Sequence, residues 1–254
     1  MSNLLAGKRV LVTREKQQAA AFAAILQAEG AISVQVPLLK IDCRHQSKLE
    51  NMATFQWVFF TSAHGVQCFF SQFQKSDLHE HVKFATVGHK TEVALLEHGY
   101  KASFIPSVYN AETMAAEFFN EYPKANDILL VRGNISRKIL VDELTKRQLH
   151  FNTIVVYETN VHLDIKAKLI DMLTEHSFDY LTFTSPSTVK AFIEMVENHP
   201  MIHQFLKIPA ICIGTTTEKA AKDFKFEQTY IPNVFTIESM VEKMIELEKA
   251  EEIK

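Results

Sequence analysis

The sequence predicts an α/β protein made of two similar units, each with a parallel sheet. Its 254 residues, 47% hydrophobic and 22% charged, can bury a core but exceed the usual size of one compact domain. Short β-branched or aromatic runs alternate with longer amphipathic segments, a pattern typical of parallel sheets covered by helices. Several motifs also occur twice in the same order, which indicates an internal duplication.

Four pairs of segments carry the duplication. They are residues 10–14 (VLVTR) with 129–132 (LLVR), 55–62 (FQWVFFTS) with 178–185 (FDYLTFTS), 85–94 (ATVGHKTEVA) with 211–220 (ICIGTTTEKA), and 104–106 (FIP) with 230–232 (YIP). Taken alone, the repeat would divide the chain near Lys124.

The elements follow from the same pattern. Strands are expected near residues 8–13, 32–37, 56–61, 83–87 and 102–106, and again near 127–132, 152–158, 178–184, 208–213 and 228–232. Five parallel strands per half favour a flavodoxin-like unit. A helix is expected over 16–29, ending at Gly30, because Ala19, Phe22, Ala23 and Leu26 share one face. The charged segment 246–254 is expected to be a solvated helix end.

Charge and cysteine content exclude several classes of protein. The net charge of −3 has no long run of one sign, so no basic face is available for a nucleic-acid partner. Cys43, Cys68 and Cys212 are widely spaced and are interpreted as core thiols in a reducing compartment. No apolar run approaches the roughly 20 residues of a membrane span. We therefore expect a cytoplasmic protein without a membrane partner.

Five polar turns each follow a strand and open a helix: residues 61–65 (TSAHG), 88–91 (GHKT), 132–134 (RGN), 184–188 (TSPST) and 214–217 (GTTT). In parallel sheets such turns meet at the carboxyl edge, where helix N-termini attract anions. Helix capping alone explains any single turn. One helix N-terminus stabilises an exposed anion by only about 0.3–1 kcal/mol, so five turns together predict a ligand with many carboxylates.

Other chemistries lack their motifs. Neither a dinucleotide-binding nor a P-loop glycine pattern is present. The spacing of His79 and His81 does not place both rings on one helix face, which favours a solvated loop over a metal site. Arg14 ends the first strand where a receiver domain would carry acidic residues, which disfavours a tandem signalling module.

The ordered motifs resemble the uroporphyrinogen-III synthase family over nearly the whole chain. They are VLVTR ending at Arg14, FTS ending at Ser62, VGxxT from Val87, VVYET around Tyr157, FTSPS from Phe183, IGxxT from Ile213, and Pro232 followed by TxESM from Thr236. Two departures are His64, where many relatives have asparagine, and the longer 233–235 spacing before Thr236.

The resemblance implies two domains that are discontinuous in sequence. Residues 1–36 with 162–254 would form the first and 39–157 the second, joined by a two-stranded β linker at 37–38 and 158–161. It implies an enzyme that cyclises the linear tetrapyrrole hydroxymethylbilane to uroporphyrinogen III, with loss of water and inversion of ring D. No cofactor or metal is expected, and the protein is expected to be a monomer. A non-catalytic two-lobed small-molecule binding protein is the alternative, because fold does not fix function.

The site residues are predicted from these motifs. Substrate binding is assigned to Arg14, Thr61, Ser62, His64, Gly88, Thr91, Arg132, Ser185, Ser187, Thr216, Thr217 and Thr236. Tyr157 is predicted to lie nearest the chemistry, because a phenol keeps its proton at neutral pH and can donate a hydrogen bond to the departing hydroxyl. The alternative is that its ring only packs the linker against a domain.

Overall fold

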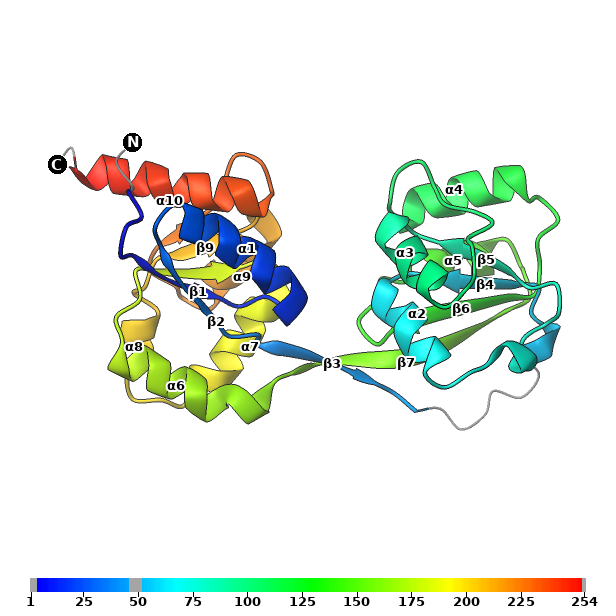
Figure 1. Ribbon diagram of the computed structural model, residues 1–254, viewed down its shortest axis with the longest axis horizontal. Helices are drawn as coiled ribbons and strands as arrows, with labels where there is room; N and C mark the ends of the chain where they lie inside the picture. The colour runs from blue at the N-terminus through cyan, green and yellow to red at the C-terminus, as the bar shows by residue number, and fades with distance from the viewer. Residues whose placement is uncertain (1–3, 46–51, 253–254) are drawn as a thin grey trace. The chain divides into compact units, whose positions relative to one another are not determined.

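The computed structural model describes residues 4–45 and 52–252 and divides into two compact units. Domain 1 is drawn from Met1–Lys40 and Asn160–Lys254, and domain 2 is Ile41–Thr159. Figure 1 shows the two units, each with its own sheet and helices. The division near Lys124 that the repeat alone suggests is wrong, because Lys124 lies within domain 2.

Domain 1 has a five-stranded sheet of order β2-β1-β8-β9-β10, in which all four pairings are parallel. Its strands are β1 (Arg9–Val12), β2 (Ile32–Gln35), β8 (Tyr180–Phe183), β9 (Ala210–Cys212) and β10 (Thr229–Tyr230). β8 is buried along its whole length, as expected for a central strand with helices on both faces.

Domain 2 has a five-stranded sheet of order β3-β7-β6-β4-β5. Its strands are β3 (Leu39–Cys43), β4 (Trp57–Phe60), β5 (Lys83–Thr86), β6 (Ile128–Gly133) and β7 (Phe151–Val161). The pairs β4–β5, β4–β6 and β6–β7 are all parallel. The strand expected at 102–106 is reduced to a single parallel bridge between Phe104 and Ala85.

Each sheet takes strands from both halves of the duplication. In domain 1, β1 of the first half pairs with β8 of the second, which joins β1 and β2 to β8, β9 and β10 in one sheet. In domain 2, β6 of the second half pairs with β4 of the first, which joins β6 and β7 to β4 and β5 in one sheet. Numbered by their place in the repeat, both sheets share the order 2-1-3-4, and β10 or the Phe104 bridge takes the fifth place. The two halves have therefore exchanged their strands.

Helices cover both faces of each sheet, and two apolar clusters per domain fill the layers. In domain 1, one face carries α1 (Lys16–Ala28) and α10 (Ile237–Glu252), and the other carries α6 (Lys166–Glu175), α7 (Pro186–Val196) and α9 (Thr215–Asp223), with α8 (Ile202–Phe205) beside them. In domain 2, one face carries α2 (Ala63–Phe70) and α3 (His89–Glu97), and the other carries α4 (Ala111–Glu121) and α5 (Ile139–Lys146). No helix in the described part of the chain is long and apolar enough to cross a membrane.

The first helix follows its sequence pattern. Ala19, Phe22, Ala23 and Leu26 are all buried, and Gly30 has the left-handed backbone (φ 80°) expected after the helix. The last helix differs from the prediction of a solvated end. Glu248 is only 8% exposed, and its carboxylate accepts a hydrogen bond from the Tyr180 hydroxyl at 2.7 Å and pairs with Lys8 at 2.8 Å. Residues 253–254 lie outside the described part.

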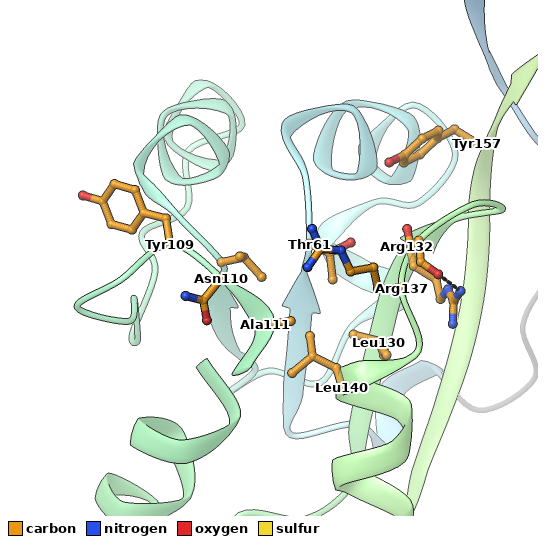
Figure 2. Close-up of a pocket in the computed structure, with 11 residues that line it drawn as sticks. Thr61, Tyr109, Asn110, Ala111, Leu130, Arg132, Arg137, Leu140 and Tyr157 are labelled. Atoms are coloured by element: carbon orange, nitrogen blue, oxygen red, sulfur yellow. Dashed lines mark hydrogen bonds between the residues drawn. The ribbon is translucent and has the colours of Figure 1, made fainter. Parts of the chain in front are cut away.

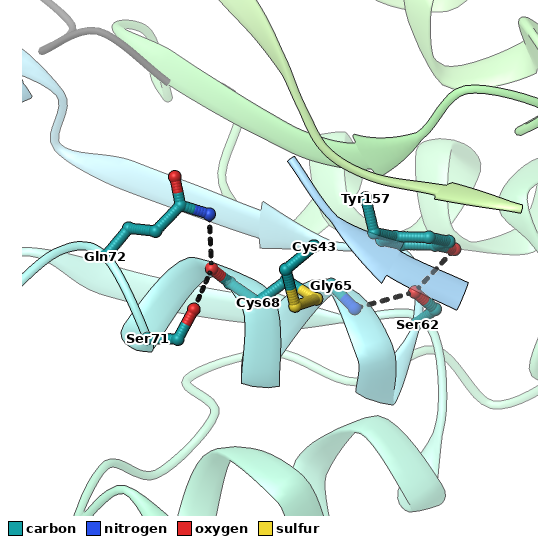
Figure 3. The surroundings of a disulfide bond; sticks show 7 residues. All are labelled: Cys43, Ser62, Gly65, Cys68, Ser71, Gln72 and Tyr157. Carbon is teal, nitrogen blue, oxygen red and sulfur yellow. Dashed lines mark hydrogen bonds between the residues drawn. A yellow bond between two sulfur atoms is a disulfide. The ribbon is translucent and has the colours of Figure 1, made fainter. Parts of the chain in front are cut away.

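The prediction of three core thiols is wrong for two of them. Cys43 on β3 and Cys68 on α2 form a disulfide, while Cys212 is a buried free thiol. Figure 3 shows the disulfide between the strand and the helix whose N-terminus carries Ser62. Their separation of 25 residues hid the pairing, because only the fold shows that β3 passes beside α2.

Candidate functional site

Most of the predicted site residues lie at or just beyond the carboxyl ends of strands, in two groups. The exceptions are Tyr157, which lies within β7 beside Gly133 at the end of β6, and Thr236, which lies just before α10. Domain 2 carries Thr61, Ser62, His64, Gly88, Thr91, Arg132 and Tyr157, and domain 1 carries Arg14, Ser185, Ser187, Thr216, Thr217 and Thr236.

Two kinds of helix start recur at these edges. Ser62 caps α2 by accepting a hydrogen bond from the Gly65 N–H at 3.0 Å, and Ser185 caps α7 by accepting one from the Thr188 N–H at 3.2 Å. Gly88 and Gly214 precede α3 and α9 without any side-chain cap. Neither helix start is therefore capped by the side chain of its first residue, which leaves an electropositive helix end at the edge of each sheet.

A cavity of about 280 Å³ opens at the carboxyl edge of domain 2 (Figure 2). Leu130 and Leu140 give it apolar walls, and Arg132 and Arg137 contribute its positive charges. Two aromatic side chains, Tyr109 and Tyr157, lie on opposite sides of it in the view of Figure 2. This combination of apolar, aromatic and basic groups suits an acidic ligand with flat apolar rings.

Tyr157 combines the two roles that the sequence left open. Its ring is buried in the apolar cluster between the domain 2 sheet and helices α2 and α3, and its hydroxyl lies 3.0 Å from the Ser62 Oγ. The ring lies directly over Gly133, where an added Cβ would overlap the ring carbons and come within 2.8 Å of the Tyr157 hydroxyl oxygen. Gly133 is therefore required for this position of the ring. The His64 ring lies 6.1 Å from the Tyr157 ring, centroid to centroid.

The loop after β6 is fastened to β7. The Arg132 guanidinium donates to the Ser136 carbonyl at 2.5 Å, and the Gly133 N–H donates to the Ser136 Oγ at 3.0 Å. The Asn134 N–H donates to the Tyr157 carbonyl at 3.2 Å. At least one donor of the half-buried Arg132 side chain is thus used for a hydrogen bond within its own loop. The Arg137 side chain is 81% exposed, and its ion pair with Glu112 among the described residues is long, at 3.8 Å, so Arg137 is the more available cation in this cavity.

Arg14 lies just beyond β1 in domain 1, and Arg132 lies in the last part of β6 in domain 2. The Arg14 guanidinium donates to the Gln18 Oε1 at 2.5 Å, while its buried Nε has no hydrogen-bond partner among the described residues. Burial lowers the pKa of the Arg14 guanidinium, although an arginine remains charged at any physiological pH. A buried donor without a protein acceptor is uncommon in native structures, and an anionic ligand would satisfy it.

Two of the predicted binding residues have buried side chains. Thr91 and Thr217, at equivalent positions in the first turns of α3 and α9, are buried beneath those helices. Their hydroxyls are not presented at the edge, so the turns offer backbone groups in their place. Thr216 and Thr236 are exposed, and the Thr236 Oγ1 caps α10 by accepting from the Ser239 N–H at 3.2 Å.

A family model described as uroporphyrinogen-III synthase HemD matches residues 20–242. The chain belongs to the uroporphyrinogen-III synthase family. Members of this family are cyclising lyases of tetrapyrrole biosynthesis. The chain is 29% identical to the uroporphyrinogen-III synthase of Chlorobaculum parvum, over 90% of this chain and 94% of that protein. It is 28% identical to the porphyrin biosynthesis protein HemD of Ruminiclostridium josui over 97% of this chain, but spans only 50% of that protein's length.

Solved structures of the uroporphyrinogen-III synthase family share the fold. The Helicobacter pylori enzyme matches with a TM-score of 0.63 at 19% identity, covering 95% of this chain and 99% of that one. A mutant Thermus thermophilus enzyme matches with a TM-score of 0.59 at 16% identity, covering 96% and 100%. At these identities the likeness concerns the fold alone.

Several residues at the two edges of this uroporphyrinogen-III synthase family member were not among the predicted site residues: Tyr109, Gly133, Ser136, Arg137 and Phe235. A signal for two of them was present. Residues 108–114 (VYNAETM) repeat as 234–240 (VFTIESM), and the pattern valine, aromatic residue, capping residue appears in both. Gly133 belongs to the polar turn 132–134, but its role depends on where Tyr157 of β7 lies, which the turn itself does not indicate. Ser136 had no repeat signal.

The described residues include no group of three or more His, Cys, Asp or Glu side chains that could hold a metal ion. His81 instead lies 3.0 Å from the carboxylate of its neighbour Glu80 on the surface. That the reaction needs no cofactor stays a prediction from the family resemblance.

Proposed function

We propose that this chain cyclises hydroxymethylbilane to uroporphyrinogen III, with loss of water and inversion of ring D. The observation that carries the proposal is that the motifs by which the chain resembles the family lie at the carboxyl edges of its two sheets. Those edges hold the features that a substrate with eight carboxylates needs, namely helix N-termini and arginine side chains.

The finer architecture belongs to the same proposal. We infer two flavodoxin-like domains joined by a two-stranded β linker made of β3 and β7. The shared strand order 2-1-3-4 supports the first part, because flavodoxin-like sheets have the order 2-1-3-4-5. The second part is supported by neighbouring strands β3 and β7, which contain the two points where the chain passes between the domains.

The chemistry is assigned to Tyr157 as the hydrogen-bond donor to the departing hydroxyl of the substrate. Its hydroxyl is placed by Ser62, which itself accepts from the Gly65 N–H at the start of α2. When the Ser62 hydroxyl donates to the Tyr157 oxygen, the phenolic proton is left for the substrate. A chain of donors polarises each following O–H bond, so this arrangement strengthens Tyr157 as a proton donor. Positioned acid catalysis contributes typically about 10²–10⁴-fold to rate.

The protein's remaining task is to control geometry. In the reaction that the family resemblance implies, loss of water yields an electrophilic azafulvene, which is attacked by ring D through a spiro intermediate. The open chain closes without assistance to the type I isomer, so binding must hold ring D for attack at its substituted carbon. Many weak anion contacts at the edges would supply this positioning without any single indispensable side chain.

We further propose that the protein acts as a cytoplasmic monomer without cofactor, metal or nucleic-acid partner. The composition and the family resemblance support this. The Cys43–Cys68 disulfide argues against a reducing compartment such as the cytoplasm, because stable disulfides are uncommon in reducing surroundings. Counting thiols in protein purified under an alkylating agent measures how much of the disulfide exists in the cell.

Product analysis tests the proposal. Purified protein, treated with a chelator and given hydroxymethylbilane, is expected to yield the type III isomer after oxidation and chromatography. Formation of the type I isomer alone, at the uncatalysed rate, would contradict it. Tight binding without turnover would instead support the alternative of a non-catalytic two-lobed binding protein.

A further inference from the structure

Two aromatic side chains stand exposed at matching places in the two domains. Tyr109 of domain 2 is 64% exposed and Phe235 of domain 1 is 56% exposed. Each follows an exposed valine, Val108 or Val234. Each also precedes the residue that caps the next helix, since Asn110 caps α4 and Thr236 caps α10.

The local backbone is the same in both copies. The Asn110 N–H donates to the Val108 carbonyl at 2.7 Å, and the Thr236 N–H donates to the Val234 carbonyl at 2.9 Å. These tight turns hold each aromatic residue at the carboxyl edge instead of folding it into the core. The aromatic position is thus a built feature of the duplicated unit.

Each aromatic side chain rests on a glycine that opens a helix. A Cβ added at Gly88 would lie 3.0 Å from the Tyr109 Cβ and Cγ, and one added at Gly214 would lie 3.2 Å from the Phe235 Cγ. The glycines therefore leave room for the aromatic residue to lie against the first turns of α3 and α9. As a result, an exposed π face and an uncapped helix N-terminus stand side by side in both domains.

Folding alone does not explain the two rings. Burying an aromatic residue stabilises a fold, whereas these two residues leave more than half of their surface in water. The methionines five residues later, Met114 and Met240, are fully buried and supply the core contacts of their segments. An exposed aromatic group kept at the same place in both copies indicates a surface for a ligand or a partner.

The neighbouring charges indicate which ligand. Tyr109 lines the domain 2 cavity together with Arg132 and Arg137, and Phe235 lies beside the helix N-terminus at Gly214. A pyrrole that carries carboxylate side arms matches both halves of this surface. Its flat ring can pack on the aromatic face, and its carboxylates can reach the guanidinium or amide donors.

We propose that Tyr109 and Phe235 are substrate-positioning residues, each of which packs against a pyrrole ring while the adjacent helix start binds a carboxylate of that ring. This inference rests on the proposed function and names two of its subsites. The contact with an apolar ring face needs aromaticity and not a hydroxyl, since one copy is tyrosine and the other phenylalanine. The two side chains should therefore affect binding and isomer choice more than the chemical step.

The test compares Tyr109→Ala and Phe235→Ala with the conservative variants Tyr109→Phe and Phe235→Tyr. Matched controls are Leu96→Ala, at the far end of α3, and Ile32→Ala, at the start of β2, which are exposed apolar residues away from the carboxyl edges. The alanine variants are expected to raise KM for hydroxymethylbilane about 2- to 10-fold and to lower the ratio of type III to type I product. Aromatic replacements and controls should keep wild-type values and all variants should keep a wild-type Tm.

Two results would overturn the inference. One is wild-type KM and wild-type product ratio in both folded alanine variants while the wild-type enzyme is active. The other is a difference in oligomeric state between the alanine variants and the wild-type protein in sedimentation experiments. Such a difference would mean that a second copy of the chain covers these rings. Failure of the proposed function is a separate outcome, since the wild-type protein itself would then make no type III isomer.

Discussion

The two carboxyl edges are built from the same repeated segments but differ at one step. In domain 1, Ser185 forms a capping box with Thr188, so its hydroxyl is used within its own helix. In domain 2, the equivalent Ser62 caps its helix and also bonds the Tyr157 hydroxyl. The features common to both edges, an arginine, an uncapped helix start and an exposed aromatic side chain, suit binding. The feature found in domain 2, Tyr157, suits chemistry.

The largest effect is expected for Gly133→Ala. The new Cβ would overlap the ring of Tyr157, so the ring must leave its place beside Ser62. We expect kcat to fall at least 100-fold and Tm to fall, because displacing a buried aromatic ring also disrupts packing. Steady-state kinetics and thermal unfolding measure both.

A double variant serves as the control for that clash. Adding Tyr157→Ala to Gly133→Ala removes the ring that the Cβ would strike. The stability losses of the two single variants should therefore not add in the double variant. Additive losses would show that Gly133 acts on stability without Tyr157.

Reduction of the Cys43–Cys68 disulfide is expected to destabilise domain 2. A cross-link that closes a loop of this length stabilises a fold by about 2–4 kcal/mol, in a model in which it restricts the unfolded chain. Trp57, the single tryptophan, lies in β4 and reports the unfolding of domain 2 by its fluorescence. Its transition should move to lower temperature with reductant or in Cys68→Ser. An unchanged Trp57 transition would contradict the structural role of the disulfide.

The serine caps should respond differently to the same substitution. Ser185→Ala removes a helix cap and is expected to cost about 0.5–2 kcal/mol of stability with little change in kcat. Ser62→Ala removes a cap and also a partner of the Tyr157 hydroxyl, so it should lower kcat about 10-fold in addition. Total loss of activity in folded Ser62→Ala would argue against a binding site distributed over many groups.

Alkaline pH is expected to weaken domain 1 first. Burial raises the pKa of the Cys212 thiol from its usual 9.0 to about 12. Burial, with help from Glu248, raises the pKa of Tyr180, and a hydrogen bond to Glu248 raises that of Lys8. Groups with a folded pKa above the unfolded value stabilise fully below the unfolded value and lose that contribution as pH rises through the folded one.

The pH window that follows runs from about 9 to about 12. Domain 2 has smaller changes of the same sign, since burial raises the pKa of Tyr100 and a hydrogen bond to Glu121 raises that of Tyr122. Thermal unfolding followed by circular dichroism should therefore shift more with rising pH than the Trp57 fluorescence transition. Equal shifts of both signals would contradict this difference between the domains.

The strands show how far the sequence can be used. The apolar runs at 56–61 and 178–184 predicted β4 and β8, because central parallel strands are continuously hydrophobic. β3 was missed, since its residues are half-buried or exposed and follow no alternation. The exchange of strands between the halves cannot be deduced from the repeat alone, because each half carries a complete set of strand patterns.

The candidate site also contains residues that the sequence predicted and residues that it did not. Turns that follow strands and open helices predicted Ser62, Gly88 and their copies, since this relation is local in sequence. Gly133 and the disulfide depend on β7 and β3 passing beside elements far away in the chain. No local pattern encodes those neighbours. The roles assigned to the predicted site residues remain predictions until variants are assayed.

The central claim is that Tyr157 donates the proton at the domain 2 edge, and Tyr157→Phe tests it most directly. The variant keeps the ring over Gly133 and removes only the hydroxyl that bonds Ser62. Tyr230→Phe in domain 1 is the matched control. Among the described residues, the Tyr230 hydroxyl donates a hydrogen bond to the surface residue Gln228. Single-turnover rates with hydroxymethylbilane should fall about 10²–10⁴-fold for Tyr157→Phe, with KM and Tm near wild type. A folded Tyr157→Phe protein with the wild-type rate would contradict the claim.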